Sequence, residues 1–343
     1  MRTFLSCAAL PFALMATLAC TQPATAQVAM TGVNMAGAEF SVPGQKPVYG
    51  KNYSYPEPEW MVYFLRKGMN VFRVPFRWGR VQPQLYEDLD PFALGKIDAL
   101  VAFAATNGAS IILSPHDFGR YKGQMIGTKE VPAEALGDLW RRLAERYKNN
   151  PRVIFGLMNE PHGISSLKWL GIANATIAVI RETGAQNLIL VPGNNWTTAG
   201  NWFRPKVGPS NSAVMGGVRD SGNNFAIEVH QYFDSDFSGR HFECPDQNIG
   251  VRTLSAFTRW LREKKLRAFL GEFGAAGDPG CLTTIENTLR FMDENSDAWM
   301  GWTYWAAGRR WRRDYPFHIE PFDGQDKPQM SVLSRFLRGN ARP

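Results

Sequence analysis

The sequence predicts an α/β fold, a single-domain (β/α)8 barrel of the TIM barrel type, and three observations lead to this. Short apolar runs rich in Val, Ile, Leu and Phe alternate with amphipathic stretches of helical length. Strands separated by helices pair in parallel through crossover connections. The chain of 343 residues holds eight such runs, about 40 residues apart, and such barrels usually take about 250 residues. An open doubly wound sheet is the alternative, but no glycine-rich phosphate-binding motif follows any run.

The predicted strands are the apolar runs themselves, because strands buried on both faces read as nearly continuous hydrophobic segments. They occupy residues 30–36, 70–76, 109–115, 153–158, 187–192, 225–230, 267–272 and 299–305. The predicted helices lie between and after the strands, near residues 57–67, 91–107, 133–149, 165–183, 252–265, 283–295 and 329–338.

Two of the predicted helices carry clear local signals. Pro132 suits the first turn of the helix near 133–149. An apolar face at three- and four-residue steps follows, formed by Leu136, Leu139, Trp140, Leu143 and Tyr147. The helix at 165–183 ends before Gly184, and glycine is the usual residue at that position.

The composition excludes several classes of protein before any motif is considered. With 44% hydrophobic and 20% charged residues, the chain is not disordered, collagen-like or a coiled coil. The formal net charge of +7 is spread along the chain, and its one tight cluster runs from Arg309 to Arg313. No RNA-binding signature accompanies this cluster, so we expect no nucleic-acid partner.

Residues 1–26 are predicted to be a secretory signal peptide, followed by one folded domain at residues 27–343. Arg2 precedes a mostly apolar stretch, and small residues at 24–26 form a cleavage site. The stretch is too short for a comfortable membrane span, and no later segment runs apolar for 18 residues. We therefore expect a secreted or periplasmic protein without stable membrane insertion. A lipoprotein anchored at Cys20 is the alternative, since the residues before it resemble a lipobox.

Two cysteines, Cys244 and Cys281, remain once the predicted signal peptide is removed. In an oxidising compartment, two cysteines indicate one disulfide. Both lie in loops rich in Gly, Pro and Asp, where the chain can bring them together. Two unpaired buried thiols are the alternative.

Side chains that are costly to bury stand at the ends of most of the apolar runs, whereas a buried parallel strand would be apolar throughout. They are Arg73, His116, Asn159, Glu160, His230, Tyr232, Glu272 and Trp305. The carboxyl ends of all strands in a parallel barrel point to one face, so these residues are predicted to converge at one mouth. Taken singly, most have a structural alternative, such as a histidine satisfied in the core or a tryptophan that only packs.

Glu160 and Glu272 are harder to explain as structural residues, because an unpaired charge directly after a buried strand is costly. Two glutamates at one mouth suit glycoside hydrolysis, in which one carboxyl donates a proton and the other attacks or activates water. Different environments set the two protonation states. Arg73 and the Tyr232 hydroxyl, placed beside one carboxylate, would keep it charged.

The chain resembles the glycoside hydrolase family 5 endoglucanases (cellulases), especially the subgroup that includes secreted fungal enzymes. The similarity covers nearly all of the chain after the signal peptide, from about Gly32 to Trp305. It is carried by GVNMAGAEF at 32–40, NYSYP at 52–56, GMNVFRVPFRW at 68–78, NPRVIFGLMNEPHG at 150–163, VPGNNW at 191–196, EVHQYFDSDFSGRHFEC at 228–244, GEFG at 271–274 and WAAG at 305–308. The long stretch at 228–244 is the most specific of these.

This resemblance implies a retaining hydrolase with residues 27–343 as its catalytic domain. Glu160, in the NEP motif, would be the acid/base, and Glu272, at the end of the seventh strand, would be the nucleophile. Asn159 would hold the 2-hydroxyl of the sugar. The expected mechanism is a double displacement, with the two carboxyl groups about 5–5.5 Å apart.

The remaining strand-end residues take supporting roles under the same resemblance. Arg73 and Tyr232 would orient and charge-stabilise the nucleophile. His116 and His230 would line the cleft near the scissile bond. Trp305 would stack on the sugar in the subsite just before that bond.

The resemblance also bears on residues outside these motifs. Cys244 and Cys281 match a cysteine pair of the subgroup, which strengthens the disulfide prediction. Asp117 departs from the pattern, since the family often has Asn there, and it would place a third acid near the mouth. The cluster from Arg309 to Arg313 is either a solvated loop or a contact with an acidic or decorated polysaccharide.

Several aromatic residues follow strand ends and are candidate platforms for sugar rings. They are Trp78, Phe118, Tyr121, Trp196 and Trp202. Core packing is the alternative for each of them. We expect no cofactor and no metal, because the histidines show no metal-ligand spacing.

The predicted function is therefore a retaining endo-β-1,4-glucanase acting on soluble or amorphous glucan as a monomer, with β-glucan polysaccharide as its partner. Mannan, xylan or mixed-linkage glucan would use the same strand-end residues, because loops decide between these substrates. A non-catalytic carbohydrate-binding protein on the same barrel is an alternative of another class. The presence of both Glu160 and Glu272 argues against it, since a binding protein could lose either.

Overall fold

The computed structural model describes residues 27–41, 45–322 and 324–337, and eight of its strands form the centre of the molecule. These strands are β1 (Met30–Met35), β2 (Val71–Phe76), β3 (Ser110–Pro115), β6 (Val153–Gly156), β7 (Ile189–Pro192), β8 (Phe225–His230), β9 (Ala268–Glu272) and β10 (Trp299–Ala307). All eight predicted strands are present, and their ends differ from the predicted ends by at most two residues.

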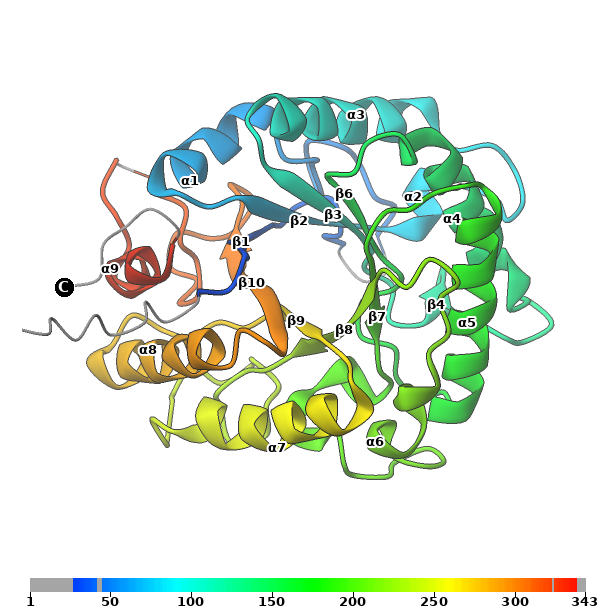
Figure 1. Ribbon diagram of the computed structural model, residues 1–343. Helices are drawn as coiled ribbons and strands as arrows, with labels where there is room; N and C mark the ends of the chain where they lie inside the picture. Colours follow the sequence, from blue (N-terminus) through cyan, green and yellow to red (C-terminus); the bar gives the residue numbers. More distant parts are fainter. Residues whose placement is uncertain (1–26, 42–44, 323, 338–343) are drawn as a thin grey trace, which may run out of the picture.

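The strands close into a barrel in the order β1-β10-β9-β8-β7-β6-β3-β2. Every neighbouring pair is parallel. Figure 1 shows the helices as an outer layer around this ring of strands. The predicted α/β class and single-domain TIM barrel are thereby confirmed.

The seven predicted helical regions are also present. Their α-helices are α1 (Met61–Lys67), α3 (Pro91–Thr106), α4 (Glu134–Tyr147), α5 (Ser166–Glu182), α7 (Ile249–Lys264), α8 (Pro279–Glu294) and α9 (Pro328–Leu333). The sequence did not predict the short elements of the loops, which include α2 (Trp78–Val81), α6 (Asn211–Val214) and a hairpin of β4 (Arg120–Tyr121) with β5 (Gln124–Met125).

One helix boundary that differs from the prediction is the start of α8, which begins four residues before the predicted position 283. Asp278 caps this helix, because its side chain accepts a hydrogen bond from the backbone N–H of Cys281. Pro279 occupies the first helical position, where its missing N–H costs nothing. The Asp-Pro pair is the start signal of this helix, and the prediction instead began at Thr283.

The interior of the barrel is apolar at one end and polar at the other. Side chains from the N-terminal halves of the strands fill one end and include Val71, Ile112, Ile154, Leu190 and Phe269. A larger apolar cluster lies between the strands and the surrounding helices. Polar groups of the barrel interior therefore gather at the C-terminal ends of the strands, which is the usual position of an active site in this fold.

Cys244 and Cys281 form a disulfide, with an S–S distance of 1.97 Å and a Cα–Cα distance of 5.2 Å. The disulfide prediction is confirmed, and the alternative of two free thiols is wrong. The bond joins the loop after β8 to the first turn of α8.

Removal of this disulfide by Cys244→Ser together with Cys281→Ser is expected to lower the free energy of unfolding by about 2–4 kcal/mol. The bond closes a loop of 37 residues, so its loss increases the entropy of the unfolded chain. Urea denaturation of the oxidised protein and the variant measures the difference. Reducing agent should destabilise the wild type by a similar amount and leave the double variant unchanged. Equal stability of all forms would contradict the prediction.

The described part of the chain contains no helix that is long and apolar enough to cross a membrane. Residues 1–26, which include Cys20, lie outside the described residues. The signal peptide and the alternative lipid anchor therefore stay predictions.

Candidate active site

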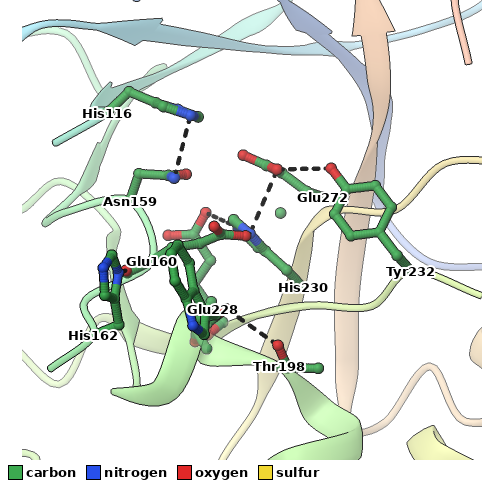
Figure 2. Close-up of polar contacts among 12 residues, drawn as sticks. His116, Asn159, Glu160, His162, Thr198, Glu228, His230, Tyr232 and Glu272 are labelled. Carbon is green, nitrogen blue, oxygen red and sulfur yellow. Dashed lines mark hydrogen bonds and ion pairs between the residues drawn. The ribbon is translucent and has the colours of Figure 1, made fainter. Parts of the chain in front are cut away.

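The strand-end residues predicted to converge do so at the C-terminal mouth of the barrel, and Figure 2 shows six of them. Arg73 lies within β2, His230 ends β8, and Glu272 ends β9. His116 lies in the loop after β3, and Asn159 and Glu160 lie in the loop after β6. Tyr232 lies in the loop after β8, and Trp305 lies near the C-terminal end of β10. Six different regions of the sequence thus supply one site.

Arg73 lies at the centre of the hydrogen-bond network and has no exposed surface. Its guanidinium donates five hydrogen bonds of 2.7–3.0 Å, to side-chain oxygens of Glu228, Asn34, Glu272, Ser114 and Asn159. A buried guanidinium with all its donors used has one orientation. Arg73 therefore fixes the positions of Asn159 and Glu272 relative to each other.

Glu272 is 3% exposed and accepts two hydrogen bonds, one at each carboxylate oxygen. Arg73 donates to Oε1 at 2.8 Å, and the Tyr232 hydroxyl donates to Oε2 at 2.9 Å. Burial raises the pKa of Glu272, whereas His230, Arg73 and the Tyr232 hydroxyl oppose this rise. Burial also raises the pKa of Tyr232 well above its usual value, so the hydroxyl stays a donor. As predicted, Arg73 and Tyr232 both lie beside this carboxylate.

Glu160 is more accessible than Glu272, with 15% of its side chain exposed. Its backbone has φ of +42°, in the left-handed region, which costs a residue other than glycine about 1–3 kcal/mol. Oε1 of Glu160 lies 2.7 Å from Nδ1 of His230. A carboxylate oxygen of Glu160 and one of Glu272 lie within 4.8 Å of each other. The carboxyl groups of inverting enzymes are about 6.5–9.5 Å apart, so the separation suits retention.

His230 lies between the two glutamates, with Nδ1 also 3.6 Å from Oε2 of Glu272. Burial lowers the pKa of His230, but Glu272, Glu160 and Glu228 outweigh it and raise the pKa to about 9. His116 behaves in the opposite way, because burial and the nearby Arg73 hold its pKa well below 6.5. One histidine of the site is thus a cation near neutral pH, and the other is neutral.

A cleft of about 460 Å³ opens beside Glu160. Its walls come from the loops after β3, β7 and β8 and include Phe118, Trp196, Lys206 and Phe237. Trp196 is 38% exposed, and its ring stacks on His162 with 3.5 Å between ring centroids. Trp196 and Phe118 thus border the cleft, so their role as sugar platforms stays a prediction, and the stacking of His162 on Trp196 was not predicted.

Trp305 lies in a second aromatic group at the mouth. Its ring is 8% exposed and stacks on His116 with 5.6 Å between centroids. Trp311 meets it edge to face at 6.0 Å and stacks on Tyr315 at 4.2 Å. These contacts hold Trp305 beside the strand ends, and its predicted stacking on a sugar stays a prediction.

Three of the predicted sugar platforms are wrong. Trp78 and Trp202 have no exposed surface, and Tyr121 is 7% exposed. Trp78 lies in α2, which turns the ring inward, and its Nε1 donates to Oε1 of Gln82 at 2.9 Å. The Tyr121 hydroxyl donates to backbone carbonyls, and Trp202 packs between aromatic rings of α7. All three residues belong to the core, which was the alternative for each.

Asp117 and the basic cluster from Arg309 to Arg313 both have structural roles. Oδ2 of Asp117 accepts a hydrogen bond from the backbone N–H of Trp78 at 2.6 Å, and Oδ1 lies 3.4 Å from Arg77. In the basic cluster, Arg309 pairs with Glu320, and the arginines that follow contact backbone carbonyls, Asp314 and the ring of Phe322. These contacts favour a structural loop over a polysaccharide contact.

Several buried polar residues at the mouth were not predicted: Asn34, Glu39, Ser114 and Glu228. Glu39 and Glu228 were visible as acids, one in the AGAEF motif and one within the apolar run of β8. A charged residue inside an apolar run was the available signal. This signal alone does not indicate what Glu39 and Glu228 contact, because their partners cannot be read from the sequence.

Glu39 is 4% exposed, with Oε2 accepting from the backbone N–H of Gly37 at 2.7 Å. Its Oε1 has no hydrogen-bond partner within the described ranges. Burial raises the pKa of Glu39 to about 7. The folded protein therefore favours the neutral carboxyl of Glu39. The contribution of this neutral carboxyl to the free energy of unfolding is lost as the pH rises through about 7.

Glu39→Gln is expected to become more stable relative to the wild type as the pH rises from 5 to 8. The difference in the free energy of unfolding between the variant and the wild type should change by about 2–3 kcal/mol between these pH values. The reason is that the Glu39 carboxyl ionises near its ordinary pKa in the unfolded chain but only near pH 7 in the folded protein. Urea denaturation of both proteins at the two pH values measures this difference. The same difference at pH 5 and pH 8 would show that the pKa of Glu39 is not raised.

Among the described residues, Glu160, His230 and Glu272 bring three possible ligand atoms within 4.8 Å of one another. Arg73 and Tyr232 already occupy both oxygens of Glu272, and Oε1 of Glu160 contacts His230. These contacts account for the cluster without an ion, so we identify none of the three as a metal ligand.

Known proteins are similar to this chain over almost its whole length. Residues 28–308 match the family model Cellulase (glycosyl hydrolase family 5). Endo-beta-1,4-glucanase B of Aspergillus niger is 34% identical over 310 residues, 89% of each chain. XacCel5A, solved in complex with cellopentaose, is 47% identical with a TM-score of 0.88, covering 91% of this chain and 100% of that one. Pseudomonas stutzeri endoglucanase Cel5A, solved in complex with cellobiose, is 35% identical with a TM-score of 0.82, covering 93% and 96%.

The match to the family model spans the barrel and the segments that contain Glu160 and Glu272. Sequence identities above 30% over most of each chain, together with the family model, confirm the predicted resemblance. The chain is a glycoside hydrolase and belongs to glycosyl hydrolase family 5.

Proposed function

We propose that the protein is an endo-β-1,4-glucanase that hydrolyses internal bonds of soluble or amorphous glucan with retention of anomeric configuration. The observation that carries this proposal is the pair of glutamates within 4.8 Å. Glu272 is buried and held by Arg73 and Tyr232, which suits a nucleophile that must stay in one position. Glu160 is more exposed and borders the cleft, which suits a group that exchanges protons with a leaving group and with water.

In the first step, a carboxylate oxygen of Glu272 forms a bond to the anomeric carbon. The bond from that carbon to the leaving oxygen breaks, and the leaving oxygen takes the proton of Glu160. Asn159, which is fixed by Arg73, holds the 2-hydroxyl of the sugar. Trp305 stacks on the same sugar, and the departing part of the chain lies in the cleft beside Glu160.

In the second step, Glu160 accepts a proton from water, and the water oxygen attacks the anomeric carbon. The ester bond to Glu272 breaks, and its electron pair returns to the carboxylate. Arg73 and Tyr232 stabilise the charge that reappears on Glu272. Both glutamates then have their starting protonation states.

The choice of β-1,4-glucan as substrate rests on the relatives, because strand-end residues are shared by enzymes for several β-glycans. Of the named relatives, the Aspergillus niger protein is an endo-β-1,4-glucanase and the Pseudomonas stutzeri protein is an endoglucanase, and XacCel5A was solved with cellopentaose bound. Mannan, xylan and mixed-linkage glucan are the alternatives. A non-catalytic binding protein is disfavoured, because both glutamates are present with their supporting contacts in place.

We also infer that residues 1–26 direct export and are removed, leaving a secreted or periplasmic monomer whose catalytic domain is residues 27–343. The position of the described domain after this segment supports the division. Mass spectrometry of the exported protein tests it. A mature N-terminus near Gln27 supports the signal peptide, whereas a lipid-modified Cys20 would replace it with a membrane anchor.

The proposed function is tested by release of reducing ends from soluble β-1,4-glucan, mixed-linkage β-glucan, mannan and xylan. Proton NMR of the first products from a β-linked oligosaccharide reports the anomeric configuration. Preferred cleavage of β-1,4-glucan with β-configured products supports the proposal. Activity only on mannan or xylan would keep the mechanism and change the substrate. No activity on any glycan from a folded protein would leave the binding protein as the better explanation.

A further inference from the structure

Glu228 is a third glutamate of the site, placed behind the two at the mouth. It lies in β8 and has no exposed surface. Side chains two residues apart on a strand point to the same face, so Glu228 and His230 both point into the barrel. Figure 2 shows Glu228 close to His230. No step of the proposed reaction uses Glu228 directly.

The contacts of Glu228 join it to two residues that hold the glutamates at the mouth. Its Oε1 accepts a hydrogen bond from Nε of Arg73 at 3.0 Å. The same oxygen lies 3.5 Å from Nε2 of His230, an ion-pair contact rather than a well-formed hydrogen bond. Its Oε2 has no hydrogen-bond partner among the residues described. One carboxylate oxygen is thus shared between Arg73 and His230.

The chain leaves room for this carboxylate at one specific position. Gly271 precedes Glu272 on the neighbouring strand β9, which pairs with β8. A Cβ atom at Gly271 would lie 2.3 Å from Oε1 of Glu228 and 3.0 Å from its Cδ. Any larger residue at position 271 would therefore displace the Glu228 carboxylate. The glycine of the GEFG motif thus provides the space that this carboxylate occupies.

The two ring nitrogens of His230 both face carboxylate oxygens. Nδ1 lies 2.7 Å from Oε1 of Glu160, and Nε2 lies 3.5 Å from Oε1 of Glu228. A neutral imidazole has one donor and one acceptor, whereas the protonated ring has two donors. Only the protonated ring can direct a donor at each glutamate.

The charges of the buried groups agree with this assignment. Burial raises the pKa of Glu228, but Arg73 and His230 outweigh it, and the pKa lies below its usual value. The charged or titratable groups that face Glu228 and His230 are Arg73, His116, Glu160, Tyr232 and Glu272. With Arg73 and His230 positive and Glu228 and Glu272 negative, the interior is balanced when Glu160 holds its proton.

We propose that Glu228 is a positioning residue that holds Arg73 and the His230 ring so that Nδ1–H of His230 donates to Oε1 of Glu160. This proposal deepens the proposed function and rests on it for the effect on turnover. With Oε1 occupied by a donor, the transferable proton of Glu160 resides on Oε2. If His230 were neutral with its proton on Nε2, its Nδ1 would instead accept the proton that Glu160 must give to the leaving oxygen.

The first test measures the protonation of His230 directly and does not depend on activity. The chain has five histidines, so their NMR signals can be followed against pH, with His230→Asn used for assignment. In the wild type, His230 should lose its proton near pH 9. In Glu228→Gln, the midpoint should fall by at least about one pH unit, because a neighbouring negative charge has been removed. An unchanged midpoint would overturn the proposal even if the enzyme is a glucanase.

The second test measures turnover of a β-1,4-linked oligosaccharide. Glu228→Gln should lower kcat by roughly 10²-fold, a typical cost of misplaced reacting groups, with little change in KM. The alkaline limb of the pH profile should move to lower pH together with the His230 midpoint. A loss of kcat with an unmoved alkaline limb would reduce Glu228 to a structural residue.

A matched control is the buried pair of Asp220 and Arg181, which are 2.7 Å apart and lie outside the site. Asp220→Asn also removes a buried carboxylate, but the His230 midpoint and the alkaline limb should not move. If Glu228→Gln does not fold, Gly271→Ala tests whether the position of the Glu228 carboxylate sets the protonation of His230. The methyl group of the introduced alanine displaces this carboxylate, and the carboxylate keeps its charge. The His230 midpoint must then fall in Gly271→Ala, and an unchanged value would overturn the proposal.

Discussion

Replacing Glu272 with glutamine is expected to lower kcat on soluble β-1,4-glucan by on the order of 10⁴–10⁶-fold, the loss typical of a removed nucleophile. The amide keeps the shape of the side chain and an acceptor for Arg73, so the fold and substrate binding should persist. It cannot form the ester on which the first step depends. Reducing-end release measures turnover, and calorimetric titration with a β-1,4-linked oligosaccharide measures binding.

The matched control for this variant is Glu320→Gln. Glu320 is also 3% exposed, but it contacts Gly308 and Arg309 and neither glutamate of the site. It should therefore keep its activity. A second variant, Glu272→Ala, leaves space for azide, which should restore turnover of an aryl β-cellobioside and give an α-glycosyl azide. Activity of Glu272→Gln above about 1% of wild type, with deamidation excluded by mass spectrometry, would mean that another group is the nucleophile.

The barrel could be predicted from the sequence because each strand carries its own signal. A run such as VFRVPF is apolar almost throughout, and its one charged residue, Arg73, indicated a role beyond packing in the core. The glutamates at the ends of two such runs were predicted to meet because strand direction alone determines the mouth. These inferences needed no knowledge of loop conformation.

Loop conformation is what the sequence could not supply. Trp196 and Trp202 follow the same strand, and both were candidate sugar platforms. Trp196 has φ of +64°, in the left-handed region, and its ring faces the cleft. Trp202 has ordinary helical angles and is fully buried. Neither conformation follows from a periodic pattern, so the two tryptophans could not be distinguished in advance.

Glu228 was missed for a different reason, because its meaning depends on long-range contacts. Its partner Arg73 is 155 residues away in the sequence. Asp117 was predicted to place a third acid near the mouth. Both of its oxygens are engaged by the backbone of Trp78 and by Arg77. The sequence gives the kind of residue at each position, whereas the partner determines whether a charge is structural or reactive.

Replacing Glu160 with alanine is expected to have an effect that depends on the leaving group of the substrate. On β-1,4-glucan the leaving group is a sugar alkoxide that needs a proton, so kcat should fall by about 10²–10⁴-fold. On an aryl β-cellobioside whose phenol is strongly acidic, bond cleavage needs little protonation, and the first step should be nearly unchanged. The second step still lacks its base and becomes rate-limiting. A burst of phenol equal to the enzyme concentration, followed by slow turnover, is the expected time course.

Azide separates the two roles of Glu160 from each other and from the role of Glu272. It needs no general base, so it should accelerate the slow phase of Glu160→Ala and give a β-glycosyl azide, the anomer opposite to that from Glu272→Ala. Glu272→Ala without azide should instead lose activity on both substrates alike, because the missing bond is needed whatever the leaving group. An equal loss on glucan and on the activated aryl substrate in Glu160→Ala, without a burst, would contradict the assignment of Glu160 as the proton donor. The proximity of the two carboxylates, which have oxygens within 4.8 Å of each other, would then need another explanation.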